Sequence, residues 1–190
     1  MKKILGFTTA FLLIIGMASI GTWAFFSDIE ASTGNVLAAG TLDLKTDDVD
    51  GVSQTLSATN MAPGDTVGPE TITLKNIGSV AGATLDLSFS YIESDGSPNP
   101  TNMMADATAA MVEVTTLNYG GSSILSSVSD GNVNGYKDIE DLKNAGLSGL
   151  GGIGTSAAKD FEIAVQLRNG TSGSYQADGI IITMSFTLNQ

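Results

Sequence analysis

The residues whose types and spacing could do chemistry lie in one asparagine- and aspartate-rich stretch, residues 130–141. Its sequence, D-G-N-V-N-G-Y-K-D-I-E-D, puts oxygen-bearing side chains at positions 1, 3, 5, 9 and 12, with glycine at position 6. This is the spacing of an EF-hand calcium loop, in which position 7 offers its main-chain carbonyl. We therefore predict a calcium ion as cofactor, with the candidate ligands Asp130, Asn132, Asn134, Tyr136, Asp138 and Asp141.

Two positions depart from the usual EF-hand loop. Asp141 stands where glutamate is usual, as it does in dockerin-like loops, and Lys137 stands where an apolar residue is usual. The alternative interpretation is a turn rich in Asn, Asp and Gly that caps a helix predicted over residues 137–145. In that helix Ile139, Leu142 and Ala145 have helical spacing, and Gly146 is a plausible C-cap.

Composition excludes several function classes. The formal net charge is −12, and loss of Lys2 and Lys3 with a leader would take it to about −14. Such a chain is a poor partner for nucleic acid, which needs clustered cations. The chain has no Cys and no His, so it has no disulfides and lacks the usual zinc ligands and the usual neutral-pH base. We find no H-E-x-x-H, no G-x-S-x-G and no catalytic residues, so we predict that it is not an enzyme.

The N-terminal residues have the pattern of a secretory signal. Lys2 and Lys3 precede an uncharged run over residues 4–20, and small residues follow. Thr22 at −3 and Ala24 at −1 place the predicted cut between Ala24 and Phe25. An uncleaved membrane anchor and a pilin-type cut after Gly6 are the alternatives. The predicted location is secreted, in the extracellular matrix or at the cell surface, with membrane contact only through the leader before cleavage.

The rest of the chain has the alternation of β-strands. Strands are predicted over residues 36–45, 52–58, 71–75, 83–92, 111–119, 122–127, 160–168 and 179–189, because apolar residues there recur every second position or β-branched residues dominate. A short helix is predicted over 103–110, and residues 147–154 are predicted to be a flexible glycine-rich loop. Turn signals separate the strands, and no long linker is visible. These features favour an all-β, jelly-roll-like β-sandwich with one or two short helical insertions.

Four motifs carry a likeness to a known family. They are G-T-W-A-F-F-S-D (21–28), A-A-G-T-L-D-L (38–44), A-P-G-D (62–65) and L-K-N-I-G-S (74–79). With these motifs the chain resembles the TasA/camelysin family of secreted prokaryotic proteins, which includes archaeal bundling-pilus relatives. The resemblance implies a jelly-roll-like sandwich and cleavage just before Phe25 by a SipW-type signal peptidase, a partner during export. It also implies a subunit of an extracellular fibre, such as a biofilm-matrix fibre or pilus.

In such fibres the freed N-terminal segment of one subunit inserts as a β-strand into the next, so copies of this chain would be its partners in a homopolymer. We predict three parts: signal peptide 1–24, donor-strand segment 25–35 and sandwich domain 36–190. One face of the donor strand presents Phe25, Ser27, Ile29, Ala31 and Thr33, and the other presents Phe26, Asp28, Glu30 and Ser32. Head-to-tail donation satisfies an open sheet edge and gives filaments rather than rings.

Other functions stay open beside the fibre. Camelysin itself is classed as a metallopeptidase, so the resemblance also carries a camelysin-like metallopeptidase, although a zinc site without His or Cys would need carboxylates alone. A monomeric calcium-binding surface or adhesion module is a further alternative, and the donor segment would then be a tail or pack on its own domain. Asn169-Gly170-Thr171 is a glycosylation sequon, a common motif that is weak evidence for modification.

Overall fold

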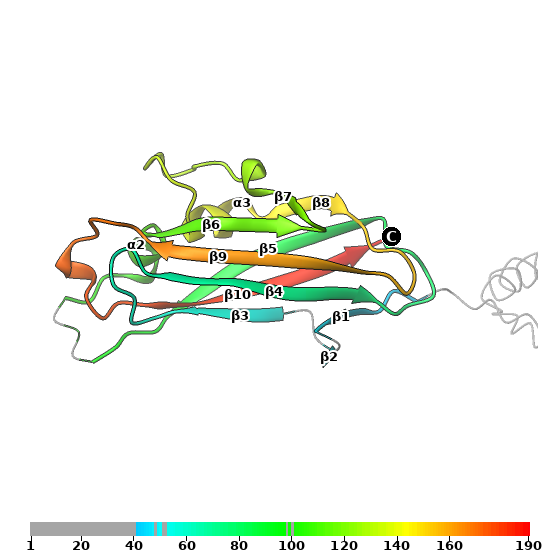
Figure 1. Ribbon diagram of the computed structural model, residues 1–190, viewed down its shortest axis with the longest axis horizontal. Helices are drawn as coiled ribbons and strands as arrows, with labels where there is room; N and C mark the ends of the chain where they lie inside the picture. The colour runs from blue at the N-terminus through cyan, green and yellow to red at the C-terminus, as the bar shows by residue number, and fades with distance from the viewer. Residues whose placement is uncertain (1–40, 48, 51–52, 98, 100) are drawn as a thin grey trace, which may run out of the picture. The chain divides into compact units, whose positions relative to one another are not determined.

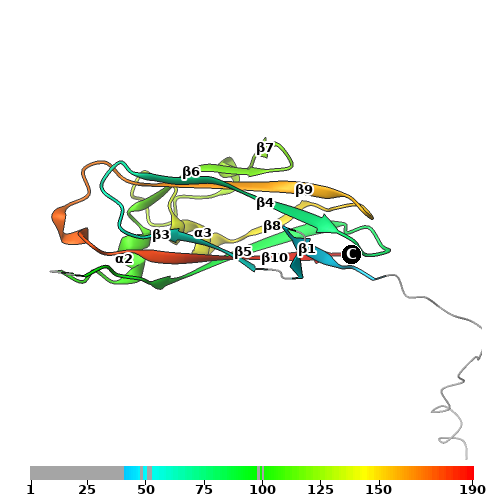
Figure 2. The same ribbon diagram turned by 60° about the horizontal axis from the view of Figure 1, so that its bottom comes forward.

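Two antiparallel sheets packed face to face make up the structure, a computed structural model that describes residues 41–47, 49–50, 53–97, 99 and 101–190 (Figure 1). One sheet has the strand order β2-β1-β4-β9-β6-β7, and the other has the order β3-β10-β5-β8. Figure 2 shows the two layers from a second side. The predicted β-sandwich with short helical insertions is confirmed.

The strands have the following bounds. The six-stranded sheet contains β1 (Leu44–Thr46), β2 (Val49–Asp50), β4 (Thr66–Asn76), β6 (Val112–Tyr119), β7 (Ser122–Ser123) and β9 (Ala158–Leu167). The four-stranded sheet contains β3 (Ser53–Ala58), β5 (Thr84–Glu93), β8 (Leu147–Gly151) and β10 (Ile180–Asn189). The helical elements are α2 (Ala105–Ala109), α3 (Ile139–Ala145) and the 3₁₀ turns η2 (Leu125–Ser127) and η3 (Gly173–Tyr175).

The core follows from the alternation that the sequence displays. Successive strand side chains point to opposite faces, so one apolar set of each strand enters the space between the sheets. Phe161 of β9 and Phe186 of β10 meet there edge to face, with ring centroids 5.3 Å apart. The predicted inward residues of β9 and the first four of β10 are all buried, namely Phe161, Ile163, Val165, Leu167, Ile180, Ile182, Met184 and Phe186. Leu188, also predicted inward, is partly buried.

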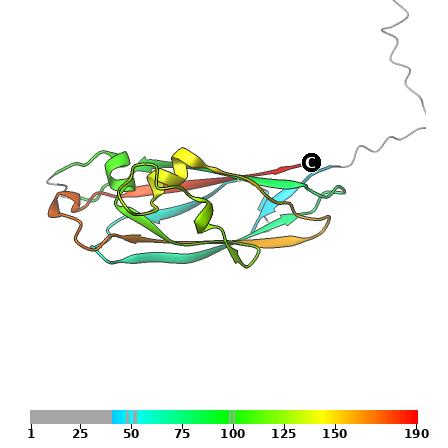
Figure 3. The same cartoon turned by 90° about the horizontal axis from the view of Figure 1, so that it is seen from above.

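Within the described residues, helices cover one long side of the sandwich and leave the other side open. Helix α3 packs against β5 and β6, and α2 contacts both α3 and β5, so the helices lie on the side that Figure 3 presents. The opposite side lies between β3, an end strand of its sheet, and the first half of β4. No strand in the described part of the chain pairs with the outer edge of either segment.

Several predicted elements were wrong. Residues 122–127 form the two-residue β7 and then η2 instead of one strand. The tight turn Gly120–Gly121, in which both residues have positive φ, folds β7 back on the end of β6. Residues 147–154 are not simply a flexible loop, because β8 pairs with β5 and buries Leu147.

Other boundaries moved. Strand β4 begins at Thr66 instead of residue 71, with an irregularity between Val67 and Glu70 around the Gly68–Pro69 peptide. Of the strand predicted over 36–45, only Leu44–Thr46 is strand within the described residues. The chain enters the sandwich at Thr41, whose main chain bonds to Ser79 and Val80. Residues 1–40, with the predicted signal peptide, cleavage site and donor segment, lie outside the described residues.

Candidate functional site

The first half of the 130–141 loop gathers the predicted ligands around one turn. The two carboxylate oxygens of Asp130 accept hydrogen bonds from the main-chain N–H groups of Asn134 (3.1 Å) and Gly135 (2.8 Å). The Oδ1 atoms of Asn132 and Asn134 accept from the N–H groups two residues further on. Gly135 has φ +88°, as the sharp turn requires, and open space where a Cβ would stand. The spacing thus brings positions 1, 3 and 5 together through local Asx turns.

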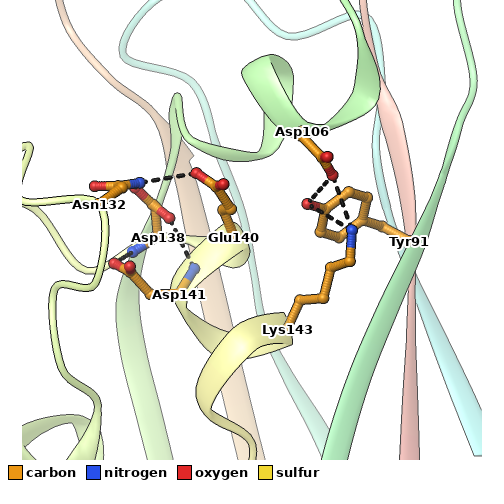
Figure 4. Close-up of polar contacts among 7 residues, drawn as sticks. All are labelled: Tyr91, Asp106, Asn132, Asp138, Glu140, Asp141 and Lys143. Carbon is orange, nitrogen blue, oxygen red and sulfur yellow. Dashed lines mark hydrogen bonds and ion pairs between the residues drawn. The ribbon is translucent and has the colours of Figure 1, made fainter.

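The second half of the loop starts helix α3. Asp138 is its N-cap, and a reciprocal capping box joins it to Asp141: each carboxylate accepts from the other's main-chain N–H, at 3.1 and 3.2 Å. Asp141 Oδ1 also accepts from Gly131 N at 2.8 Å, which ties the two ends of the loop together. Figure 4 shows the contact of Asp138 with Asp141. Both residues are buried. The alternative interpretation, a turn that caps the helix, therefore describes part of what these residues do.

Two carboxamides fill the centre of the loop. Asn132 Nδ2 and Asn134 Nδ2 both donate to Asp138 Oδ2, at 3.1 and 2.7 Å, and Asn132 also donates to Glu140 (2.9 Å; Figure 4). Burial nevertheless raises the pKa of Asp138, because the desolvation of its charge outweighs these hydrogen bonds. The partial positive charges of the two amide groups thus face Asp138 and compensate its charge incompletely.

The loop's donor set fits calcium in kind, with carboxylate, carboxamide and carbonyl oxygens. A cation would have to turn the two amides so that oxygen replaces nitrogen at the centre. Within the described residues, no three His, Cys, Asp or Glu side chains are grouped so that they could hold a metal ion. Calcium binding there would therefore rest on the Asn and main-chain oxygens as much as on carboxylates.

Lys137 and its neighbour Tyr136 make contacts outside the loop. Lys137 Nζ donates to the carbonyl of Leu125 at 2.8 Å, which ties the loop to the first residue of the 3₁₀ turn η2. The guanidinium of Arg168 lies 4.4 Å from the ring centre of Tyr136. Lys137 therefore holds the loop to its neighbour through its charge, where an apolar residue would do so by packing.

A polar cluster that sequence reasoning missed joins β5, α2 and α3. The hydroxyl of Tyr91 donates to Asp106 Oδ1 at 2.6 Å, and Lys143 Nζ lies 2.8 Å from the same oxygen and over the Tyr91 ring (Figure 4). Lys143 and Tyr91 lower the pKa of Asp106, while burial and then Asp106 raise the pKa of Tyr91. No sequence signal links these residues, because Lys143 is 37 positions from Asp106.

The open side carries the second candidate site, a groove between β3 and β4 of about 320 Å³. Its lining includes four apolar side chains, three buried and Val67 half-buried: Leu56, Val67, Ile72 and Met184. At one end Gln54 Nε2 donates to Thr46 Oγ1 at 3.1 Å, which links the two sheets. The groove thus has a floor of core side chains, called here the apolar strip, with polar side chains of the two strand edges around it.

The two edges differ in how well they are protected. Strand β3 reads S-Q-T-L-S-A, with no Pro, no Gly and no charge, and it pairs only with β10. The facing part of β4 contains Gly68, Pro69 and Glu70 together with the register shift. Proline, charge and bulges are the features that prevent edge-to-edge pairing. The outer edge of β3 is therefore the better acceptor for an added strand.

Fold and sites together define a mostly-β sandwich protein with an open edge and an acidic loop. A family model described as camelysin metallo-endopeptidase matches residues 1–144. The chain therefore belongs to the camelysin family, which confirms the TasA/camelysin resemblance. A search of curated proteins found no match.

Membership has limited consequences for activity and location. Proteins of this family are secreted or surface proteins. The family's name is that of a metallopeptidase, and the expectation that this chain is not an enzyme stays a prediction. No helix in the described part of the chain is long and apolar enough to span a membrane.

The polar cluster of Tyr91, Asp106 and Lys143 gives a pH-dependent prediction. Asp106→Asn should lower the free energy of unfolding at pH 7 by less than about 1 kcal/mol, because the ion pair is exposed. The folded-state pKa of Asp106 is lowered, so this contribution is present above the unfolded pKa, about 3.9, and is lost as the pH falls through the folded pKa. Urea unfolding at pH 7 and about pH 3 measures it, with Asp43→Asn as the control. An equal loss at both pH values would contradict the assignment.

Proposed function

We propose that this protein is a secreted structural subunit that polymerises head to tail into an extracellular fibre or pilus. The donated strand is residues 25–33 of the donor-strand segment 25–35, and the acceptor is the outer edge of β3 together with the groove beside it. The observation that carries the proposal is this unprotected edge above apolar side chains. Membership of a family of secreted and surface proteins supports the location.

The groove and the donor segment are complementary in chemistry. Phe25 and Ile29 lie on one face of the extended segment and would cover the apolar strip, while Asp28 and Glu30 would face water. That orientation also keeps the two acids away from Asp47 and Glu70, which line the groove. Nine extended residues span roughly 30 Å, and the six of β3 roughly 20 Å, so the donor can follow the whole edge.

Donation to a second copy, rather than to the donor's own sandwich, extends the assembly without closing it. Cleavage between Ala24 and Phe25, by a SipW-type signal peptidase, would free the donor segment at the moment of export. Gly34 and Asn35 would then serve as the hinge between the donor segment and the body. Export and polymerisation would in this way be consecutive steps, and the leader would prevent assembly inside the cell.

Deletion of residues 25–35 from the mature chain should abolish filaments. The sandwich should stay folded, since every strand described above lies outside the deletion. Negative-stain electron microscopy measures the filaments, and far-ultraviolet circular dichroism checks the β signal. Filaments that persist at the same density would rule out donation by this segment.

A matched pair of variants tests the acceptor groove in the same assay. Val67→Lys places a charge among the apolar side chains of the groove, and Thr66→Lys places the same charge on the neighbouring exposed position. Val67→Lys should suppress filaments, and Thr66→Lys should leave them. Equal filament formation by the two variants would contradict the assignment of the groove.

We further propose that the 130–141 loop binds calcium, because its Asx turns place the oxygens of positions 1, 3 and 5 on one turn. The loop would support helix α3, which it precedes, and strand β6. The main-chain N–H of Val114 in β6 donates to the carbonyl of Lys137 at 2.7 Å. This role is compatible with the fibre and equally with a monomeric surface or adhesion module.

Calcium should raise the melting temperature of the mature chain, and Asp130→Ala should reduce that gain. The carboxylate of Asp130 holds the first turn of the loop, so its loss removes both a ligand and the turn geometry. Differential scanning calorimetry with calcium or with a chelator gives the measurement, and Asp43→Ala is the control. A gain of the same size in Asp130→Ala and in the parent would refute the loop as a calcium site.

A further inference from the structure

A second group of oxygen ligands lies at the end of the sandwich remote from Thr41 (Figure 1). There β5 ends at Glu93 and β10 begins at Ile180, and the connections that follow β5 and precede β10 are bonded to each other. Ser94 N donates to Gly179 O at 2.9 Å, and Gly96 N donates to Ala177 O at 2.7 Å. These two hydrogen bonds join the two connections at one corner of the sandwich.

Asp178 is the buried centre of this corner, with 8% of its surface exposed. Its Oδ1 accepts from Asn99 Nδ2 at 2.8 Å and from Met103 N at 3.2 Å. Its Oδ2 is buried and has no hydrogen-bond partner. Asn99 Oδ1 is likewise buried and without a partner. A buried acceptor without a donor lowers the stability of the fold, unless a water molecule or an ion binds to it.

More negative charge stands at the rim of the corner. Glu93 and Asp95 are exposed, and Asp95 accepts from Gly179 N at 3.3 Å. The carboxyl of Asp95 beside Glu93 is the main cause that raises the pKa of Glu93, and the charge of Asp178 acts in the same direction. A hydrogen bond from Asn102 opposes that rise. The geometry therefore places two buried oxygens without partners, on Asp178 and Asn99, in a corner whose rim also carries Glu93 and Asp95.

We propose that this corner binds a divalent cation, and that Ca²⁺ suits it best. Every candidate ligand is an oxygen, which hard cations require. Asp178 and Asn99 would supply the two buried oxygens, and Glu93 or Asp95 would complete the shell with water. Ca²⁺ accepts six to eight oxygens in irregular geometry, whereas Mg²⁺ demands a near-ideal octahedron.

The described residues offer no cage of three acidic side chains, so the binding is weak. The expected Kd is on the order of 10⁻⁴ to 10⁻³ M, the range of extracellular calcium modules. A water molecule could supply the missing hydrogen bond to Asp178 Oδ2, but unlike a cation it would not neutralise the buried charge of Asp178. The cation would tie the connection after β5 to the start of β10, and it needs neither the 130–141 loop nor filament formation.

Calcium titration of the mature chain by isothermal calorimetry tests the proposal. All variants carry Asp130→Ala, so that any contribution of the 130–141 loop is weakened and is the same in each, and magnesium is titrated separately. Asp178→Asn keeps an oxygen for the Asn99 and Met103 donors but removes the charge, and it should weaken calcium binding at least tenfold. Asp43→Asn, the same change at an exposed position, should leave it unaltered.

A second variant covers the case in which Asp178→Asn fails to fold. Glu93→Gln combined with Asp95→Asn changes only exposed carboxylates at the rim, and it should also weaken calcium binding severalfold. Unchanged affinity in the variants that fold, or no calcium binding by the parent at about 5 mM, well above the expected Kd, would overturn the proposal. The second result would mean that water alone fills the corner.

Discussion

The rest of the fold depends on β10, the last strand of the chain. It lies in the middle of its sheet, where it pairs with β5 along its whole length and with β3 on its other edge. Its inward side chains close the core against β9, and Phe186 meets Phe161 there. Because β3 has no other strand partner among the described residues, the four-stranded sheet forms only when the C-terminal strand is in place. Strands β9 and β10 both lie beyond residues 1–144, the part of the chain that matches the camelysin family model.

The same arrangement leaves one long side of the sandwich unfinished. The helices and the connection between β7 and β8 occupy the side of β5 and β6, whereas β3 and the first half of β4 meet across an apolar groove. A sheet edge without proline or charge is a hazard for a protein that must stay monomeric. In the proposed subunit, which would polymerise after export, the same edge would be the means of assembly, and the leader would control when the donated strand becomes available.

Sequence reasoning succeeded where the pattern is local. The two-residue period of β5, β9 and β10 is visible without the fold, and the Asx turns around Asp130 depend only on near neighbours. It failed for β8, because a glycine-rich segment becomes a strand only through its pairing with β5. It also missed the contact of Asn99 with Asp178, which are 79 positions apart. The open edge of β3 could not be predicted, since it depends on which strands lie beside it.

The account rests on β3 as the acceptor of a strand from another subunit. Amide hydrogen exchange of residues 53–58, compared between filaments and the mature chain lacking residues 25–35, tests this most directly. Outward N–H groups of β3 should exchange at least about tenfold more slowly in filaments, because a donated strand takes up their hydrogen bonds, while those paired with β10 change little. Exchange of β3 that is equal in the two states, with new protection at another edge, would contradict the account.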